Sequence, residues 1–150
     1  MNMKFFCLLL ALLAISTSAV WAHCPGNSSE EDSLYAFLEG TYHLIGRLPD
    51  SKETYSGKVV LKKTDDALQI TRVINGKEIK GVGKLEAATA DKIKVLRIRF
   101  IDESKRYEAT YLVNSDLDNY ARLSGYLYLI QGGTKVPGLE TLFIDHQAFK

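Results

Sequence analysis

Eight short stretches between Gly40 and Ile144 alternate apolar and polar residues, and each stretch closes at a turn signal. A period of two residues is typical of strands with one buried face. Many such strands joined by short links indicate a small antiparallel barrel or sandwich. The strands are expected at Thr41–Arg47, Thr54–Lys63, Ala67–Ile74, Lys77–Leu85, Lys92–Ile101, Arg106–Val113, Tyr120–Leu129 and Gly138–Ile144.

One short helix is expected ahead of the strands, at Ser29–Glu39. Ser29 can cap its first turn, which carries the acidic residues Glu30 and Glu31, and Gly40 follows its last residue. A polar cap, an acidic first turn and a glycine stop are the usual signals of helix ends. The chain is therefore predicted to be all-β apart from this helix.

The turn Asn75-Gly76 fixes the register of one strand pair. Asn-Gly between two apolar stretches is the signal of a two-residue type I′ hairpin. This turn sets Arg72 opposite Ile79 and gives the pair one apolar face and one polar face. The apolar face carries Leu68, Ile70, Ile74, Ile79 and Leu85.

The same alternation, carried through the other strands, predicts a closed barrel. Every link is short, so sequential up-and-down pairing is the simplest topology. Inward glycines suit the bends that close a sheet, which favours a barrel over a two-sheet sandwich. These glycines are Gly46, Gly57, Gly81, Gly83 and Gly125. We expect a single eight-stranded domain over residues 23–150.

Residues 1–22 are expected to be a signal peptide. Lys4 precedes the apolar run Phe5–Ile15, and the small residues Val20 and Ala22 suit a cleavage site. The run is too short for a transmembrane helix. We therefore expect an exported protein, periplasmic or secreted, without a membrane span.

Removal of this leader changes the charge and the cysteine count. Lys4 is its one charged residue, so 18 Lys and Arg remain against 18 Asp and Glu. A net charge near zero argues against nucleic acid or an anionic membrane surface as the main partner. Cys24 becomes the single cysteine, which excludes an internal disulfide and leaves a free thiol, a bridge between chains or lipidation as alternatives.

The stretch Phe37-Leu38-Glu39-Gly40-Thr41-Tyr42 resembles the opening of the calycins, the lipocalin, fatty-acid-binding and avidin-like barrels, with Tyr42 where those barrels carry Trp. A longer pattern is similar to uncharacterised exported bacterial proteins of lipocalin-like type. It comprises Gly40-Thr41-Tyr42, Leu48-Pro49-Asp50, Tyr55-Ser56-Gly57, Gly81-Val82-Gly83 and Leu139-Glu140-Thr141-Leu142. The resemblance implies a calycin-like barrel that binds a small apolar or amphipathic molecule.

Arg72 is the sharpest candidate for a binding residue, because the hairpin register turns it inward. A buried charge is costly unless it is paired. Arg72 is thus expected to recognise an anionic group of a ligand, to pair with Glu140, or to reach water at the rim. Four inward tyrosines would either line a cavity with Arg72 and Glu140 or fill the barrel. These are Tyr42, Tyr55, Tyr107 and Tyr111.

Tyr126 and Tyr128 are expected to point outward beside Tyr120. Paired aromatic side chains on an exterior face are more typical of a contact surface than of a solvated one. They predict an interface with a second copy or another protein.

We expect neither an enzyme nor a metal or cofactor site. The chain has no Gly-x-Ser-x-Gly, His-Glu-x-x-His or paired-carboxylate motif, and its acidic turn residues, such as Asp102-Glu103, suit the capping of backbone amides. Two functions remain. One is a small-molecule carrier, and the other is an interaction protein, such as a hydrolase inhibitor, whose loops 47–53 or 130–137 enter a partner. Cavity size separates them.

Overall fold

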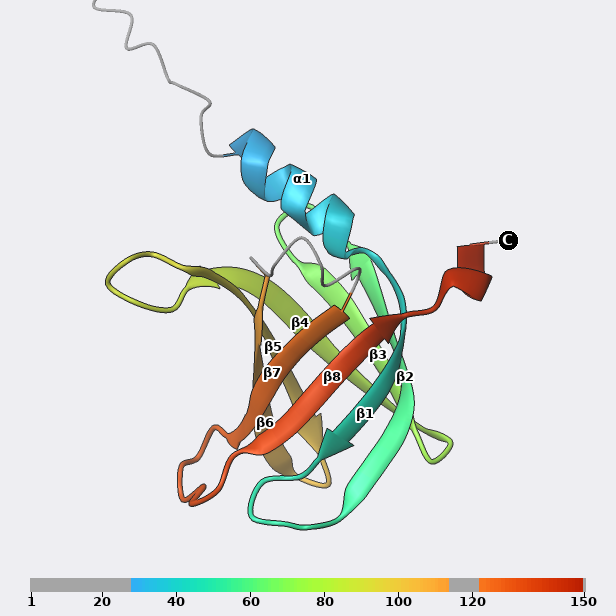
Figure 1. The fold of residues 1–150 in the computed structure, drawn as a ribbon, viewed down its shortest axis with the longest axis vertical. Helices are drawn as coiled ribbons and strands as arrows, with labels where there is room; N and C mark the ends of the chain where they lie inside the picture. The colour runs from blue at the N-terminus through green and yellow to red at the C-terminus, as the bar shows by residue number, and fades with distance from the viewer. Residues whose placement is uncertain (1–27, 114–121, 150) are drawn as a thin grey trace, which may run out of the picture.

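The computed structural model describes residues 28–113 and 122–149, which form a closed eight-stranded antiparallel barrel (Figure 1). Each strand pairs with its neighbours in sequence, and the last strand pairs with the first. The elements are α1 (Ser28–Leu38), β1 (Gly40–Arg47), β2 (Thr54–Lys63), β3 (Leu68–Ile74), β4 (Lys77–Ala87), β5 (Lys94–Asp102), β6 (Lys105–Leu112), β7 (Arg122–Leu129), β8 (Gly138–Ile144) and the short 3-10 helix η1 (His146–Phe149).

The predicted fold class is confirmed, and the strand bounds differ by a few residues. At the β4–β5 link, β4 ends at Ala87 instead of Leu85 and β5 begins at Lys94 instead of Lys92. Lys92 has a positive φ of 56° and its N–H donates to the Thr89 carbonyl, so this residue belongs to the turn. The predicted leader, Cys24 and Tyr120 lie outside the described residues.

The predicted register of the β3–β4 hairpin is also confirmed. Asn75 and Gly76 have φ of 50° and 78°, as a type I′ turn requires. Arg72 consequently pairs with Ile79 across the two strands. The buried core is formed by inward residues of all eight strands together with Tyr35 and Leu38 of α1.

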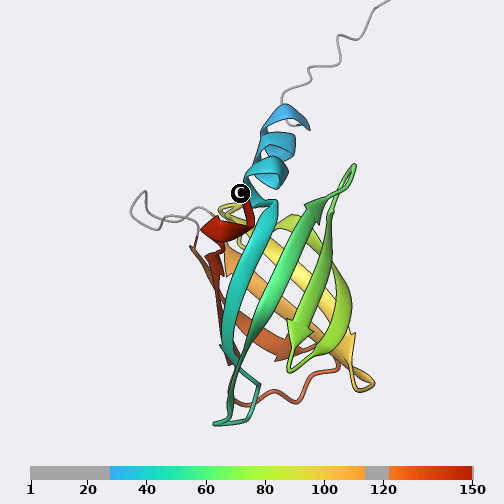
Figure 2. The same ribbon diagram turned by 90° about the vertical axis from the view of Figure 1, so that its right-hand side faces the viewer.

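The last turns of α1 close one end of the barrel (Figures 1 and 2). Leu38 is completely buried, and the Tyr42 hydroxyl donates a hydrogen bond of 2.9 Å to its carbonyl. Burial raises the pKa of Tyr42 to about 12, so this phenol stays neutral. The Tyr35 hydroxyl accepts a bond from the backbone N–H of Leu85, which fixes the helix against β4.

The opposite end, called the loop end here, carries the links 48–53, 75–76, 103–104 and 130–137 (Figure 2). Asp50 ties the first of these links to the last. Its carboxylate accepts bonds from the N–H groups of Lys135 (3.0 Å) and Val136 (2.7 Å), and its own N–H donates to the Val136 carbonyl. The loop end therefore has one braced side, formed by two links that are distant in sequence.

Replacing Gly76 with Val should lower the free energy of unfolding by about 1 kcal/mol or more, because a β-branched residue is strained at positive φ. An added Cβ would meet no atom within 4 Å, so backbone strain is the only cost. Gly76→Asn is the matched control, since Asn tolerates this conformation. Urea unfolding midpoints test this. Equal midpoints for the two variants would contradict the register argument.

Candidate functional site

A buried ion pair crosses the interior of the barrel between β3 and β8. The side chains of Arg72 and Glu140 are 1% and 0% exposed. The Arg72 guanidinium donates from Nη1 to Oε2 (3.1 Å) and from Nη2 to Oε1 (2.5 Å) of Glu140. This two-bond arrangement is the strongest geometry for an arginine–carboxylate pair.

Two phenols complete the coordination of the Glu140 carboxylate. Tyr55 of β2 donates its hydroxyl to Oε1, and Tyr111 of β6 donates to Oε2. The carboxylate thus accepts four hydrogen bonds. Burial alone would raise the pKa of Glu140. The charge of Arg72, together with the hydrogen bonds from Arg72, Tyr111 and Tyr55, instead holds this pKa below its usual value. Glu140 is therefore ionised at neutral pH.

Inward glycines on both sides of Glu140 let these phenols reach it. In the register, Gly46 of β1 and Gly125 of β7 both stand beside Glu140. Tyr55 stands beyond Gly46, and Tyr111 stands beyond Gly125. The five residues form one row across β2, β1, β8, β7 and β6, in the order Tyr55, Gly46, Glu140, Gly125, Tyr111.

The space above each glycine is occupied by the neighbouring ring. A Cβ built on Gly46 would lie 2.6 Å from Cζ of Tyr55. A Cβ on Gly125 would lie 2.9 Å from Cδ1 of Tyr111 and 2.2 Å from the Thr110 carbonyl oxygen. Any side chain at either position would displace the phenol that serves Glu140.

Two aromatic rings extend this cluster toward the loop end. The guanidinium carbon of Arg72 lies 4.1 Å from the centroid of the Phe100 ring, a cation–π contact. Phe100 in turn stacks on Tyr107, with ring centroids 5.3 Å apart. The Arg72 Nε has no hydrogen-bond partner among the described residues.

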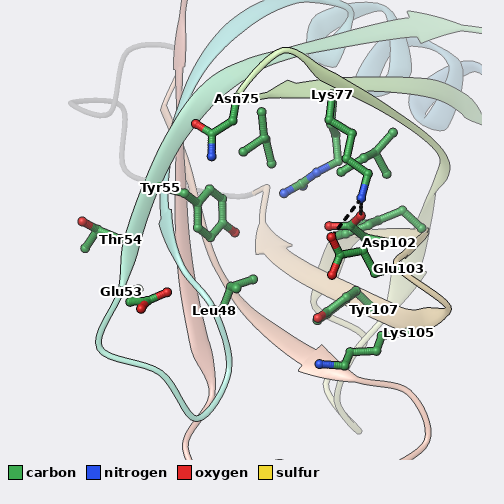
Figure 3. Close-up of a pocket in the computed structure, with 14 residues that line it drawn as sticks. Leu48, Glu53, Thr54, Tyr55, Asn75, Lys77, Asp102, Glu103, Lys105 and Tyr107 are labelled. Atoms are coloured by element: carbon green, nitrogen blue, oxygen red, sulfur yellow. Dashed lines mark hydrogen bonds and ion pairs between the residues drawn. The ribbon is translucent and has the colours of Figure 1, made fainter.

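A cavity of about 490 Å³ opens from this cluster to the loop end (Figure 3). Arg72, Tyr55 and Phe100 line it beside apolar side chains from β3, β4 and the link between β1 and β2. The apolar lining residues are Leu48, Ile74 and Ile79, and the polar ones nearer the opening are Glu53, Thr54, Asn75, Lys77, Asp102, Glu103, Lys105 and Tyr107. The cavity thus combines an apolar wall with a polar opening.

An ion-pair cluster occupies one side of the opening. The Lys77 ammonium pairs with the carboxylates of Asp102 and, at 3.5 Å, Glu103 (Figure 3). Capping of backbone amides was expected from the sequence for Asp102 and Glu103, and the structure instead pairs both with a lysine of β4. Burial and these two carboxylates raise the pKa of the Tyr107 hydroxyl.

The structure brings together four of the six predicted ligand-binding residues and places the other two elsewhere. Arg72, Tyr55, Tyr111 and Glu140 form the central cluster, and of the three alternatives for Arg72 the pair with Glu140 is the one observed. An arginine that reaches water is excluded by its burial. Tyr107 lines the cavity, whereas Tyr42 faces inward at the helix end, bonded to Leu38.

Phe100 and Lys77 were not among the residues singled out from the sequence. The alternation of β5 turns Phe100 inward, but its contact with Arg72 depends on the register of β4 with β5. The predicted interface residues Tyr126 and Tyr128 are 54% and 38% exposed, with ring centroids 6.4 Å apart.

Comparison of the chain with protein-family models and with curated proteins gave no match. Within residues 28–113 and 122–149, no helix has the length and apolar character to cross a membrane, and no three His, Cys, Asp or Glu side chains are grouped for metal binding. The class supported here is an eight-stranded antiparallel barrel, compatible with a calycin-like fold, in which a cavity at the loop end lies above a buried ion pair.

Replacing Arg72 with Met should cost about 3 to 5 kcal/mol of unfolding free energy, because the Glu140 charge is left buried without its partner. Adding Glu140→Gln should recover much of this loss, since the pair is then removed as a unit. Arg99→Met is the control, because Arg99 pairs with Glu86 and Glu108 on the exterior, where ion pairs contribute about 1 kcal/mol or less. Urea unfolding at neutral pH measures the wild type, Arg72→Met, Glu140→Gln, the double variant and Arg99→Met. Additive losses in the double variant would contradict the coupling.

Proposed function

We propose that the protein binds a small amphipathic molecule in the loop-end cavity. The main support for this proposal is the cavity itself. Its volume of about 490 Å³ lies within the range of about 300 to 1,000 Å³ that is usual for ligand pockets. Its wall of Ile74, Ile79 and Phe100 suits an apolar body. Its polar opening suits a head group that stays near water.

The buried ion pair supports this proposal by setting the depth of the cavity. Arg72 lines the inner end, with its charge already balanced by Glu140. Beyond it, toward α1, the barrel is filled by apolar core residues such as Leu44, Leu61 and Ile70, all at most 1% exposed. The ligand would therefore enter from the loop end and stop at Arg72.

The proposal includes export through the predicted leader 1–22. It also holds that the protein binds its ligand without catalysing a reaction. The buried acid, Glu140, uses its oxygens to accept bonds from Arg72, Tyr55 and Tyr111. A carboxylate held in this way is suited to structural work more than to proton transfer, which needs a group in reach of a substrate.

A tryptophan that fills the cavity should abolish ligand binding. Ile74 lines the cavity, whereas Val73, the next residue of β3, is 39% exposed on the exterior. Ile74→Trp should therefore remove saturable binding of an apolar fluorescent probe, and Val73→Trp, which adds the same ring outside, should leave it unchanged. Fluorescence titration and native mass spectrometry of the purified protein measure this. Equal binding by both variants would contradict the cavity as the site.

A second candidate function is contact with another protein molecule, favoured by an apolar exterior over β6, β7, β8 and β1. Soluble monomers rarely expose large continuous apolar patches. We define this outer apolar face by Ile45, Leu112, Tyr126, Tyr128, Leu139 and Phe143, which are 38–59% exposed. Tyr126 and Leu139 stand side by side in the register. A second copy of the chain is the partner we propose to test.

If the outer apolar face joins two copies, the double change Tyr126→Ser and Leu139→Ser should convert a dimer into a monomer, because it removes apolar area from the centre of the contact. Val82→Ser is the control, since Val82 is 51% exposed on β4, outside this face. Analytical ultracentrifugation over a concentration series gives the masses. A wild-type protein that stays monomeric throughout would exclude the second copy.

A further inference from the structure

The charges that line the cavity define the polar end of its ligand. Three carboxylates, of Glu53, Asp102 and Glu103, stand against the two ammonium groups of Lys77 and Lys105. The formal charge of these five side chains is therefore −1. Figure 3 shows Glu53 on one side of the opening and Asp102 with Glu103 on the other.

The positive charge at the inner end does not offset this field. Arg72 lines the cavity, but its guanidinium is balanced by the buried Glu140 carboxylate at 2.5 and 3.1 Å. An anionic head group would therefore find no free cation at the inner end and net repulsion at the opening. The raised pKa of Tyr107, caused by burial and then by Asp102 and Glu103, agrees with negative charge at this edge.

Arg72 also keeps hydrogen-bond donors that no described residue uses, since its guanidinium has five N–H groups and donates two bonds to Glu140. Its side chain is 1% exposed, yet Nε has no partner among the described residues. A buried donor without a partner costs free energy, which a ligand acceptor at the inner end would recover. The inner end of the ligand should therefore carry an uncharged acceptor atom, since an anion there would face Glu140.

We propose that the ligand is an amphipathic amine, with an uncharged oxygen acceptor toward Arg72, an apolar body against Ile74, Ile79 and Phe100, and its cation near Glu53, Asp102 and Glu103. This inference rests on the proposed function of the cavity. It narrows the ligand class, since it excludes the anionic amphiphiles that an unpaired Arg72 would select.

Three probes with the same phenol ring test the charge. They are tyramine, a cation, tyrosol, which is neutral, and hydroxyphenylpropionate, an anion. Calorimetric titration at low salt should give tyramine the tightest binding, about tenfold over the anion, because the opposing charges lie within a few ångströms. The difference should shrink at about 1 M salt, where the screening length falls to about 3 Å. Phenethylamine, which lacks the phenol oxygen, should bind more weakly than tyramine.

A charge-changed variant supplies the decisive comparison. Glu53→Gln with Glu103→Gln leaves Asp102 against two lysines, so the charge of the opening becomes +1 and the preference should reverse toward the anion. The control is Glu78→Gln with Asp65→Asn, which removes the same charge from exposed residues outside the cavity lining and should keep the preference for tyramine.

The neutral probe tyrosol distinguishes a failure of the proposed function from a failure of the amine assignment. If tyrosol and both charged probes fail to bind, the proposed function fails. If tyrosol binds but tyramine is no tighter than the anion, only the amine assignment fails.

Discussion

The interior of this barrel depends on one carboxylate. Glu140 accepts bonds from Arg72 on β3, Tyr55 on β2 and Tyr111 on β6, so a single side chain of β8 connects strands that do not all neighbour one another. A buried charge is tolerated only with such complete pairing. The glycines Gly46 and Gly125 are part of the same requirement, because each leaves the space through which a phenol reaches the carboxylate.

The position of this cluster divides the interior into two parts. Toward α1 the inward residues are apolar and fully packed, and the helix end is closed by Leu38 and Tyr42. Toward the loop end the inward side chains do not fill the barrel, and they line the cavity, with Arg72 at its inner boundary. The ion pair therefore acts as a partition, and the part of the barrel that we propose for binding is the part that the core does not fill.

The fold was predictable from the sequence because its signals are local. Alternation in each strand and the Asn75-Gly76 turn are read within a few residues, and they also turned Arg72 inward. The partner of Arg72 was left open, since β3 and β8 meet only across a closed barrel, and closure geometry is not encoded locally. The missed contact of Lys77 with Asp102 has a different reason, because it joins the first residue of β4 to the last residue of β5 and depends on the register of these two neighbouring strands.

The placement of charge explains why the head group of a ligand should remain at the opening. At the inner end, the charge of Arg72 is already balanced by Glu140, so a second charge there would be desolvated without a partner. At the opening, Glu53 and Glu103 are exposed, and a charged group keeps part of its hydration while it gains their attraction. A molecule charged at one end only is thus best accommodated with that end outward and its neutral end against Arg72.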